Sequence, residues 1–415
     1  MEYGLVGKKL GHSFSKQIHD SFNKYQYDLV ELNESEFASF IEKRDFKGIN
    51  VTIPYKEKVI PYLDQISPEA KLINAVNVVI NKDNKLIGFN SDYYGFKLML
   101  EYFNIEVKNK KVLILGTGGT SKTITQVVKT LNAKKIIYLS REKKLENTYS
   151  YSDLDQISSS VEVIINTTPK EMYPNNDQEI ISLDGFSSLE AVVDVIYNPL
   201  RTNLTLKARE RKIKYCNGLY MLIAQAFSAM EIFLDQKFST DIINKLYLEM
   251  LKEKENIVLI GMPSSGKSTI SKELAKKLNR KSIDIDEEIE KEIKMPIKDY
   301  FKNHTEKEFR EIESFVINKI SLLNNVVIAT GGGSILKEKN INALRQNGKL
   351  VFLDRSLDNL ISTDSRPLSS NKNDLEQLYQ KRYQLYLKSA DLVVDGDLKI
   401  DEVVKEILKS LEGSK

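Results

Sequence analysis

Short apolar runs alternate with longer, helix-compatible stretches along the whole chain. The runs are rich in Val, Ile and Leu and contain few polar residues. Such runs are typical of strands that are buried on both faces of a parallel sheet. Their alternation with helical segments predicts an α/β fold.

The runs fall into three sets. The first set predicts strands and helices in alternation, with strands at 3–6, 29–32 and 49–53 and helices at 16–25 and 36–43. The second predicts a doubly wound, Rossmann-like domain, with strands at 112–115, 136–139, 161–166, 191–196 and 213–216. The third predicts another parallel sheet, with strands at 256–260, 282–286, 326–329, 350–353 and 392–394.

The same pattern suggests a division into domains. Residues 1–100 are expected to form a first α/β domain, to which helices at about 218–251 return. Residues 101–237 would form the Rossmann-like domain, and the charged segment 252–256 would be a linker. Residues 256–415 would form the third domain.

Charge and composition narrow the classes of function. The chain has 61 basic and 58 acidic residues, for a net charge of +3, and no basic block interleaved with aromatic residues. Nucleic acid is therefore not an expected partner, and small molecules are. No apolar run approaches the roughly 18 residues that would span a bilayer, so no membrane association is expected.

The cysteine and histidine content bears on the cellular location and on metal binding. The single cysteine, Cys216, excludes a disulfide framework and favours a cytoplasmic protein with Cys216 in a core strand. The three histidines lie far apart, without the spacing of metal ligands. We expect no histidine-based metal site.

A phosphate-binding loop follows the strand at 256–260. The segment from Gly261 to Ser268, GMPSSGKS, fits the Walker pattern, in which the lysine reaches the terminal phosphates and the last hydroxyl helps to hold Mg²⁺. The expected ATP contacts within and beside it are Gly261, Ser264, Ser265, Gly266, Lys267, Ser268 and Thr269.

A second glycine motif follows the strand at 112–115. Gly116, Gly118 and Gly119 could turn a helix N-terminus toward a phosphate. The motif alone is compatible with either a dinucleotide site or an ordinary strand-to-helix turn.

Three segments of the first domain place polar groups where strands are expected to end. They are Gly11 to Ser15, Asn50 to Lys56 and Asn90 to Gly95. Their hydroxyls and amides suit a polyhydroxylated ligand. Lys56 and Asp92 could exchange the proton of a substrate hydroxyl during hydride transfer.

These segments, followed by the Gly116 motif, closely resemble shikimate 5-dehydrogenase over residues 1–251. The resemblance implies that Lys56 and Asp92 are catalytic and that residues 1–100 bind shikimate. The implied shikimate ligands are Ser13, Ser15, Asn50, Thr52, Asn77 and Gln225. The implied NADP contacts are Gly116, Gly118, Gly119, Ser140, Arg141, Asn166, Tyr197 and Gly218.

The choice of nicotinamide cofactor depends on the end of the second Rossmann strand, where an arginine favours NADP and an acid favours NAD. Arg141, Lys143 and Lys144 favour NADP, whereas Glu142 is compatible with NAD. Further departures from the family pattern are Asn74, Val78 and Tyr220.

Beyond the Walker loop, two carboxylates and several arginines carry the chemistry. Asp284 and Asp286 could separately serve a metal-bound water and an acceptor hydroxyl. Arginines can hold a substrate carboxylate or the charge of a transferring phosphoryl group. Three of them lie in motif-like segments, at Arg310, Arg366 and Arg382.

This ordered set closely resembles shikimate kinase from residue 256 onward. The resemblance implies Ser268 and Asp284 at Mg²⁺, Asp286 on the acceptor hydroxyl, and catalytic roles for Lys267 and for Arg366, which would also contact ATP. The implied shikimate ligands are Asp286, Arg310, Gly331, Gly332, Gly333 and Arg382. Thr305 and the pair Tyr383-Gln384 depart from the family pattern.

Together the two resemblances predict a bifunctional cytoplasmic enzyme. Its first half would reduce 3-dehydroshikimate to shikimate with NADPH, and its second would phosphorylate the shikimate 3-hydroxyl with MgATP. The expected cofactors are NADP(H), ATP and Mg²⁺, in a monomer or homodimer. Two alternatives stay open: a metabolite sensor without turnover, and a quinate-type dehydrogenase that uses NAD and is fused to a small-molecule kinase.

Overall fold

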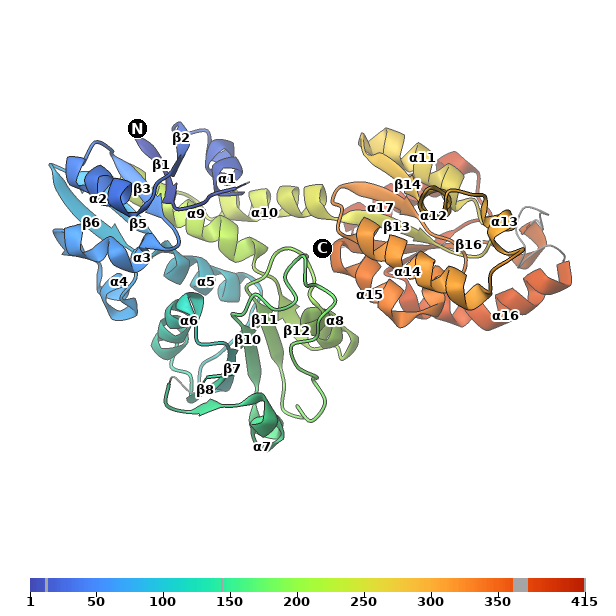
Figure 1. Ribbon diagram of the computed structural model, residues 1–415, viewed down its shortest axis with the longest axis horizontal. Helices are drawn as coiled ribbons and strands as arrows, with labels where there is room; N and C mark the ends of the chain where they lie inside the picture. Colours follow the sequence, from blue (N-terminus) through green and yellow to red (C-terminus); the bar gives the residue numbers. More distant parts are fainter. Residues whose placement is uncertain (12–13, 143–144, 361–371, 414–415) are drawn as a thin grey trace. The chain divides into compact units, whose positions relative to one another are not determined.

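The computed structural model describes residues 1–11, 14–142, 145–360 and 372–413 (Figure 1). The chain forms two compact units. The first consists of Met1–Lys170, Glu179–Tyr197 and Lys207–Glu249. The second consists of Glu171–Gln178, Asn198–Leu206 and Met250–Lys415.

The first sheet of the N-terminal unit is mixed, with strand order β2-β1-β3-β5-β6-β4. Its parallel part was expected from the apolar runs, and the antiparallel β5–β6 hairpin was not. Asp83 and Asn84 connect these two strands with φ of 53° and 60°, the left-handed backbone that a tight hairpin turn requires. The strands are β1 (Tyr3–Gly7), β2 (Tyr27–Glu31), β3 (Gly48–Val51), β4 (Gln65–Ile66), β5 (Val78–Lys82) and β6 (Lys85–Phe89).

Helices pack against this sheet (Figure 1). The local sequence sets their limits: in α2, Asn33 forms a capping box with Glu36, and Arg44 ends the helix in a left-handed conformation. The helices are α1 (Phe14–Phe22), α2 (Glu34–Lys43), α3 (Tyr55–Lys58), α4 (Pro68–Ile73) and α5 (Ser91–Tyr102).

The second sheet of this unit is entirely parallel, in the order β12-β11-β10-β7-β8-β9. This agrees with the doubly wound pattern predicted from the apolar runs, and Cys216 is buried at the end of β12, as predicted. The strands are β7 (Lys111–Leu115), β8 (Lys135–Leu139), β9 (Thr148–Tyr149), β10 (Val163–Asn166), β11 (Ala191–Asp194) and β12 (Lys214–Cys216). The helices are α6 (Gly119–Thr130), α7 (Leu154–Ile157) and α8 (Asn203–Glu210).

Two later helices, α9 (Leu219–Leu234) and α10 (Asp241–Lys254), follow the second sheet. Helix α9 packs tightly against α5. The approach is so close that a Cβ atom at Gly95 would lie 2.9 Å from Cβ of Gln225. This close approach brings Gln225 next to the N-terminal motifs. Helix α10 runs through most of the charged segment predicted as a linker, and β13 begins two residues after it.

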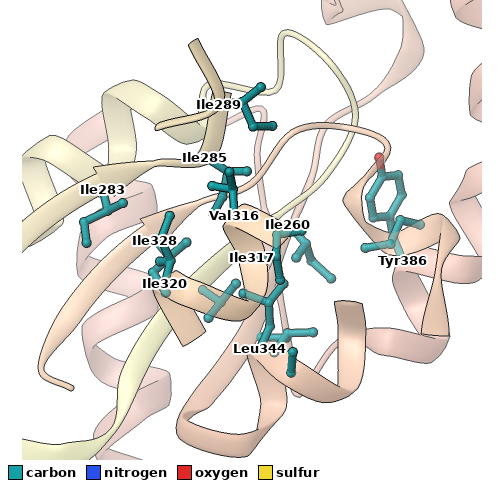
Figure 2. Close-up of a cluster of buried hydrophobic side chains, with 14 of the residues drawn as sticks. Ile260, Ile283, Ile285, Ile289, Val316, Ile317, Ile320, Ile328, Leu344 and Tyr386 are labelled. Carbon is teal, nitrogen blue, oxygen red and sulfur yellow. The ribbon is translucent and has the colours of Figure 1, made fainter. Parts of the chain in front are cut away.

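The C-terminal unit has a parallel sheet with the order β14-β15-β13-β16-β17. Alternate residues of β13 face opposite sides: Val258 and Ile260 belong to one buried cluster, and Ile257 and Leu259 to another. Figure 2 shows the first cluster, in which isoleucines of several strands and helices meet Tyr386. Burial on both faces explains the continuous apolar runs in the sequence.

The strands of this sheet are β13 (Asn256–Ile260), β14 (Lys281–Asp284), β15 (Val326–Ala329), β16 (Gly348–Asp354) and β17 (Leu392–Asp395). The helices are α11 (Lys267–Leu278), α12 (Ile285–Ile293), α13 (Ile297–Tyr300), α14 (Glu306–Ser321), α15 (Glu338–Asn347), α16 (Lys372–Ser389) and α17 (Ile400–Gly413). Strand β14 is shorter than predicted, because Asp284 caps α12 and Asp286 lies in that helix's first turn. No helix in the described ranges is both long and apolar enough to cross a membrane.

Candidate active sites

A cavity of about 330 Å³ in the N-terminal unit gathers residues from all three polar segments of the sequence. Of the predicted substrate and catalytic residues, it is lined by Ser15, Asn50, Thr52, Lys56, Asn77, Asp92 and Gln225. Ser13 lies outside the described residues. Tyr197, which was predicted to contact the cofactor, also lines this cavity. Its ring and that of Phe14 form a T-shaped pair with 5.8 Å between the ring centroids.

An ion pair occupies one side of this cavity. Nζ of Lys56, in α3, lies 2.6 Å from Oδ2 of Asp92, in the first turn of α5. The side chains are 32% and 20% exposed, so both can reach a ligand in the cavity. The pair is placed to exchange a proton with a substrate oxygen.

Neutral amides and hydroxyls occupy the other side. The side chain of Asn77 holds Ser91 twice, accepting from its N–H at 2.7 Å and donating to its hydroxyl at 3.2 Å. The Ser91 hydroxyl lies 3.5 Å from Oε1 of Gln225 on α9. Helix α9 thus completes a hydrogen-bonded wall that begins at the end of β3.

The Gly116 motif forms the turn between β7 and α6. Gly116 has φ of 94°, and a Cβ atom there would lie 2.8 Å from Cγ2 of Thr168. Added Cβ atoms at Gly118 and Gly119, at the start of α6, would meet no atom of the described chain within 4 Å. An open helix N-terminus of this kind fits the pyrophosphate of a dinucleotide.

Two further predicted NADP residues, Ser140 and Asn166, contact residues of this turn or residues beside it. Ser140 lies 3.3 Å from the Thr117 hydroxyl, and the exposed Arg141 follows it at the end of β8. Asn166 is fully buried and donates to Asp194 while accepting from the N–H and hydroxyl of Thr168. The Asn166 side chain thus holds Thr168 in place. At Gly218, a Cβ atom would overlap the Val195 carbonyl.

The C-terminal unit has its own cavity, of about 660 Å³, above the Walker loop. Lys267 donates to the carbonyls of Gly261 and Met262 at 3.0 and 2.8 Å. The Ser268 hydroxyl donates to Oδ2 of Asp284 at 2.5 Å. A hydroxyl beside a carboxylate is the set of hard oxygen ligands that Mg²⁺ prefers.

The predicted substrate residues of this unit line the same cavity. They are Asp286, Arg310, Gly331, Gly332, Gly333 and Arg382. The three glycines pack closely against other residues of the cavity: a Cβ atom at Gly331 would lie 2.7 Å from Oδ1 of Asp286, one at Gly332 would lie 2.8 Å from the Pro263 ring, and one at Gly333 would overlap the Arg310 guanidinium. Arg366 lies outside the described residues.

Two arginines are among the charged residues that line this cavity. Arg310 pairs with Glu313 at 2.8 Å and with Glu306 at 3.0 Å. Arg382 donates to the Gly332 carbonyl at 3.0 Å, and burial lowers the pKa of its guanidinium. A guanidinium held away from water attracts an anionic substrate more strongly than an exposed one does.

Comparison with known proteins identifies both units. Residues 5–79 match the family model described as the shikimate dehydrogenase substrate binding domain. A curated Clostridium perfringens protein, shikimate dehydrogenase (NADP(+)), is 37% identical over 265 residues, which cover 60% of this chain and 97% of that protein. The chain belongs to the shikimate dehydrogenase family.

Solved structures agree with this assignment. A chorismate mutase/shikimate 5-dehydrogenase fusion protein from Clostridium acetobutylicum superimposes with a TM-score of 0.57 at 36% identity, over 60% of this chain and 96% of that one. Shikimate 5-dehydrogenase from Listeria monocytogenes, solved with shikimate and NAD, gives 0.54 at 26% identity, over 59% and 96%.

Residues 263–412 match the family model described as shikimate kinase. The chain is therefore an enzyme that joins a shikimate dehydrogenase to a shikimate kinase domain, and both resemblances stated from the motifs are confirmed.

Departures from the family patterns have local explanations. In the dehydrogenase, Asn74 ends α4 with φ of 56°, a conformation that asparagine tolerates better than most residues. Tyr220 stacks on Tyr102 at 4.3 Å and donates to Asn244. In the kinase, Thr305 caps α14 and Tyr383 donates to Asp354.

Sequence reasoning missed four buried residues that support these sites. Ser91 and Glu313 carried a signal, since Ser91 stands beside Asp92 in its motif and Glu313 follows Arg310 by one helical turn. Tyr27 and His19 lie in segments without a motif. Both contribute to the dehydrogenase cavity, His19 directly and Tyr27 through Asn50.

His19 should make the stability of the dehydrogenase depend on pH. It is 1% exposed, and burial lowers the pKa of its imidazole from 6.5 to about 3. Between these values the unfolded state binds a proton that the folded state does not, so the free energy of unfolding should fall as the pH drops below 6.5. The expected slope reaches about 1.4 kcal/mol per pH unit.

Urea unfolding at pH 7.5 and pH 5.5, with hydrogen exchange of the β1–β3 amides as the local probe, would measure this dependence. His19→Gln should flatten it, and the same substitution at the exposed His304 should not. An unaltered slope in His19→Gln would show that other groups cause the dependence.

Proposed function

We propose that the chain catalyses two consecutive reactions: NADPH-dependent reduction of 3-dehydroshikimate to shikimate, and phosphorylation of the shikimate 3-hydroxyl by MgATP. The observation that carries the proposal is that each unit has its own polar cavity with a different reactive group, the Lys56–Asp92 pair in one and the Walker lysine in the other. The product of the first reaction is the substrate of the second.

In the reduction, the residues of the first cavity hold the substrate and one proton. Bound NADPH would supply the hydride. The Lys56 ammonium would donate its proton to the carbonyl oxygen as that oxygen gains charge, and Asp92 would hold the ammonium in place. The amides of Asn50, Asn77 and Gln225 would fix the hydroxyls of the ring.

In the phosphorylation, the second cavity would align an acceptor hydroxyl with bound MgATP, which supplies the phosphoryl group. Asp286 would accept the proton of that hydroxyl, and Arg310 and Arg382 would hold the carboxylate. Lys267 and Arg366 would stabilise the charge of the transferring group, and Ser268 and Asp284 would hold Mg²⁺.

A coupled assay on the purified full chain tests the proposal. With 3-dehydroshikimate and MgATP present, ADP should form only after NADPH is added, and shikimate alone should also drive ADP formation. NADPH loss without ADP would refute the kinase reaction. Neither signal from folded protein would favour a metabolite sensor without turnover.

The preference for NADP should reside at Arg141. This exposed guanidinium follows β8, where the 2′-phosphate of NADP is expected to bind. Arg141→Ala should lower kcat/KM with NADP⁺ about tenfold and leave kcat/KM with NAD⁺ unchanged. Initial rates of shikimate and quinate oxidation with both cofactors would measure this, and a wild-type preference for quinate and NAD⁺ would favour the quinate-type alternative.

A further inference from the structure

A buried tyrosine outside every sequence motif reaches the substrate cavity of the dehydrogenase through Asn50. Tyr27, on β2, has no exposed surface, and its hydroxyl donates to Oδ1 of Asn50, on β3, at 2.7 Å. Strand β1 lies between these two strands. The phenol therefore reaches across one strand to hold a residue that lines the cavity.

The surroundings of Asn50 permit one orientation of its amide. Nδ2 donates to the main-chain oxygen of Asn77 at 3.2 Å. Because a main-chain carbonyl can only accept, the amide nitrogen must face it, and Oδ1 then faces Tyr27. The other N–H of Asn50 has no partner in the part of the chain that the structure describes.

Asn77 is oriented by the same logic. Its Oδ1 accepts from the main-chain N–H of Ser91, a group that can only donate, and its Nδ2 donates to the Ser91 hydroxyl. Both asparagines therefore turn their carbonyl oxygens into the protein. Both residues line the cavity, and each amide has a second N–H that is left to donate to an acceptor oxygen of a ligand.

The ring of Tyr27 is itself held in place. His19 stacks on it with a centroid distance of 3.9 Å and an interplanar angle of 9°. Nδ1 of His19 in turn lies 2.6 Å from the Tyr25 hydroxyl. The direction of the Tyr27 hydroxyl is thus fixed by packing that is independent of any ligand.

We propose that Tyr27 is a positioning residue of the dehydrogenase, which keeps the Asn50 amide turned so that it donates to a substrate oxygen and cannot accept from a substrate hydroxyl. This inference rests on the proposed oxidation and reduction of shikimate. It assigns part of the specificity for oxygen-rich ligands to a residue that does not touch them.

The test is Tyr27→Phe in the full chain, which keeps the stacked ring and removes the hydroxyl. Oδ1 of Asn50 then loses its buried donor, and only the bond from Nδ2 to the Asn77 carbonyl still holds the amide. KM for shikimate in NADP⁺-dependent oxidation should rise about tenfold. The values of kcat and of KM for NADP⁺ should stay unchanged, because Tyr27 contacts neither Lys56 nor Asp92.

Tyr55→Phe is a matched control. Tyr55 is also fully buried, stacks on Phe37 at 4.0 Å, and donates to the Leu32 carbonyl at 2.6 Å, away from Asn50. Tyr55→Phe should lower the free energy of unfolding without changing KM for shikimate. The kinase of the same molecule supplies a second control, since its KM for shikimate should be unchanged in both variants.

A double-mutant cycle with Asn50→Ala separates positioning from a general structural effect. Tyr27→Phe should raise KM in the wild-type background and have no further effect when Asn50 is absent. An equal rise in both backgrounds, or an equal rise in Tyr55→Phe, would overturn the inference. A wild-type protein that does not oxidise shikimate would instead refute the proposed function.

Discussion

Lys56→Ala is expected to lower kcat for shikimate oxidation by roughly 10²–10⁴ and to leave shikimate phosphorylation unchanged. The substitution would remove the group proposed to exchange a proton with the substrate hydroxyl, and it leaves the Asp92 carboxylate without its ion-pair partner. Steady-state rates of both reactions on one preparation would measure the effect.

The control for this prediction lies two residues further along α3. Lys58→Ala removes an equally charged side chain, which pairs with Glu34 at 2.7 Å on the surface. It should leave both activities unchanged. Dehydrogenase activity retained in Lys56→Ala would show that another group protonates the substrate.

Lys267→Ala should have the opposite selectivity, with kcat for phosphorylation lowered by roughly 10²–10³ and oxidation of shikimate unchanged. Lys267 is 7% exposed and is held by the carbonyls of the Walker loop, so its ammonium is fixed where the terminal phosphates are expected. No other described residue of that loop, 261–268, carries a positive charge.

ADP formation with shikimate and MgATP is the measurement. Lys272→Ala is the matched control, because Lys272 lies in the same helix and pairs with Glu287 at 3.4 Å on the surface. If either Lys267→Ala or Lys56→Ala removed both activities from folded protein, the two sites would not be independent.

Every strand of the C-terminal sheet could be predicted from the sequence to within two residues. The central strands β13, β15 and β16 are buried on both faces and have continuous apolar runs, whereas the edge strands β14 and β17 are partly exposed. The β5–β6 hairpin was missed because its second strand, Lys85–Phe89, has only a partly buried, mixed sequence. The two strands are connected by the turn at Asp83 and Asn84, which the apolar pattern does not mark.

The residues of the two sites also differ in whether the sequence could reveal them. Residues such as Lys56 and Lys267 stand in motifs whose spacing is local, and the structure places them in the two cavities. The link between Tyr27 and Asn50 depends on the order β2-β1-β3 and on the register of two strand pairs. The spacing of residues along the chain does not determine that register. The link between the two residues could therefore not be predicted from the sequence alone.

The close contact of α5 with α9 at Gly95 also bears on how the enzyme is made. A nascent chain that has emerged from the ribosome only as far as β12 already contains Lys56 and Asp92, yet it lacks Gln225 and the helix that closes the wall behind Ser91. During synthesis the dehydrogenase cavity is therefore completed only by a segment that is translated long after Lys56 and Asp92. A C-terminal truncation that removes α9 should yield no working dehydrogenase, however intact its first sheet.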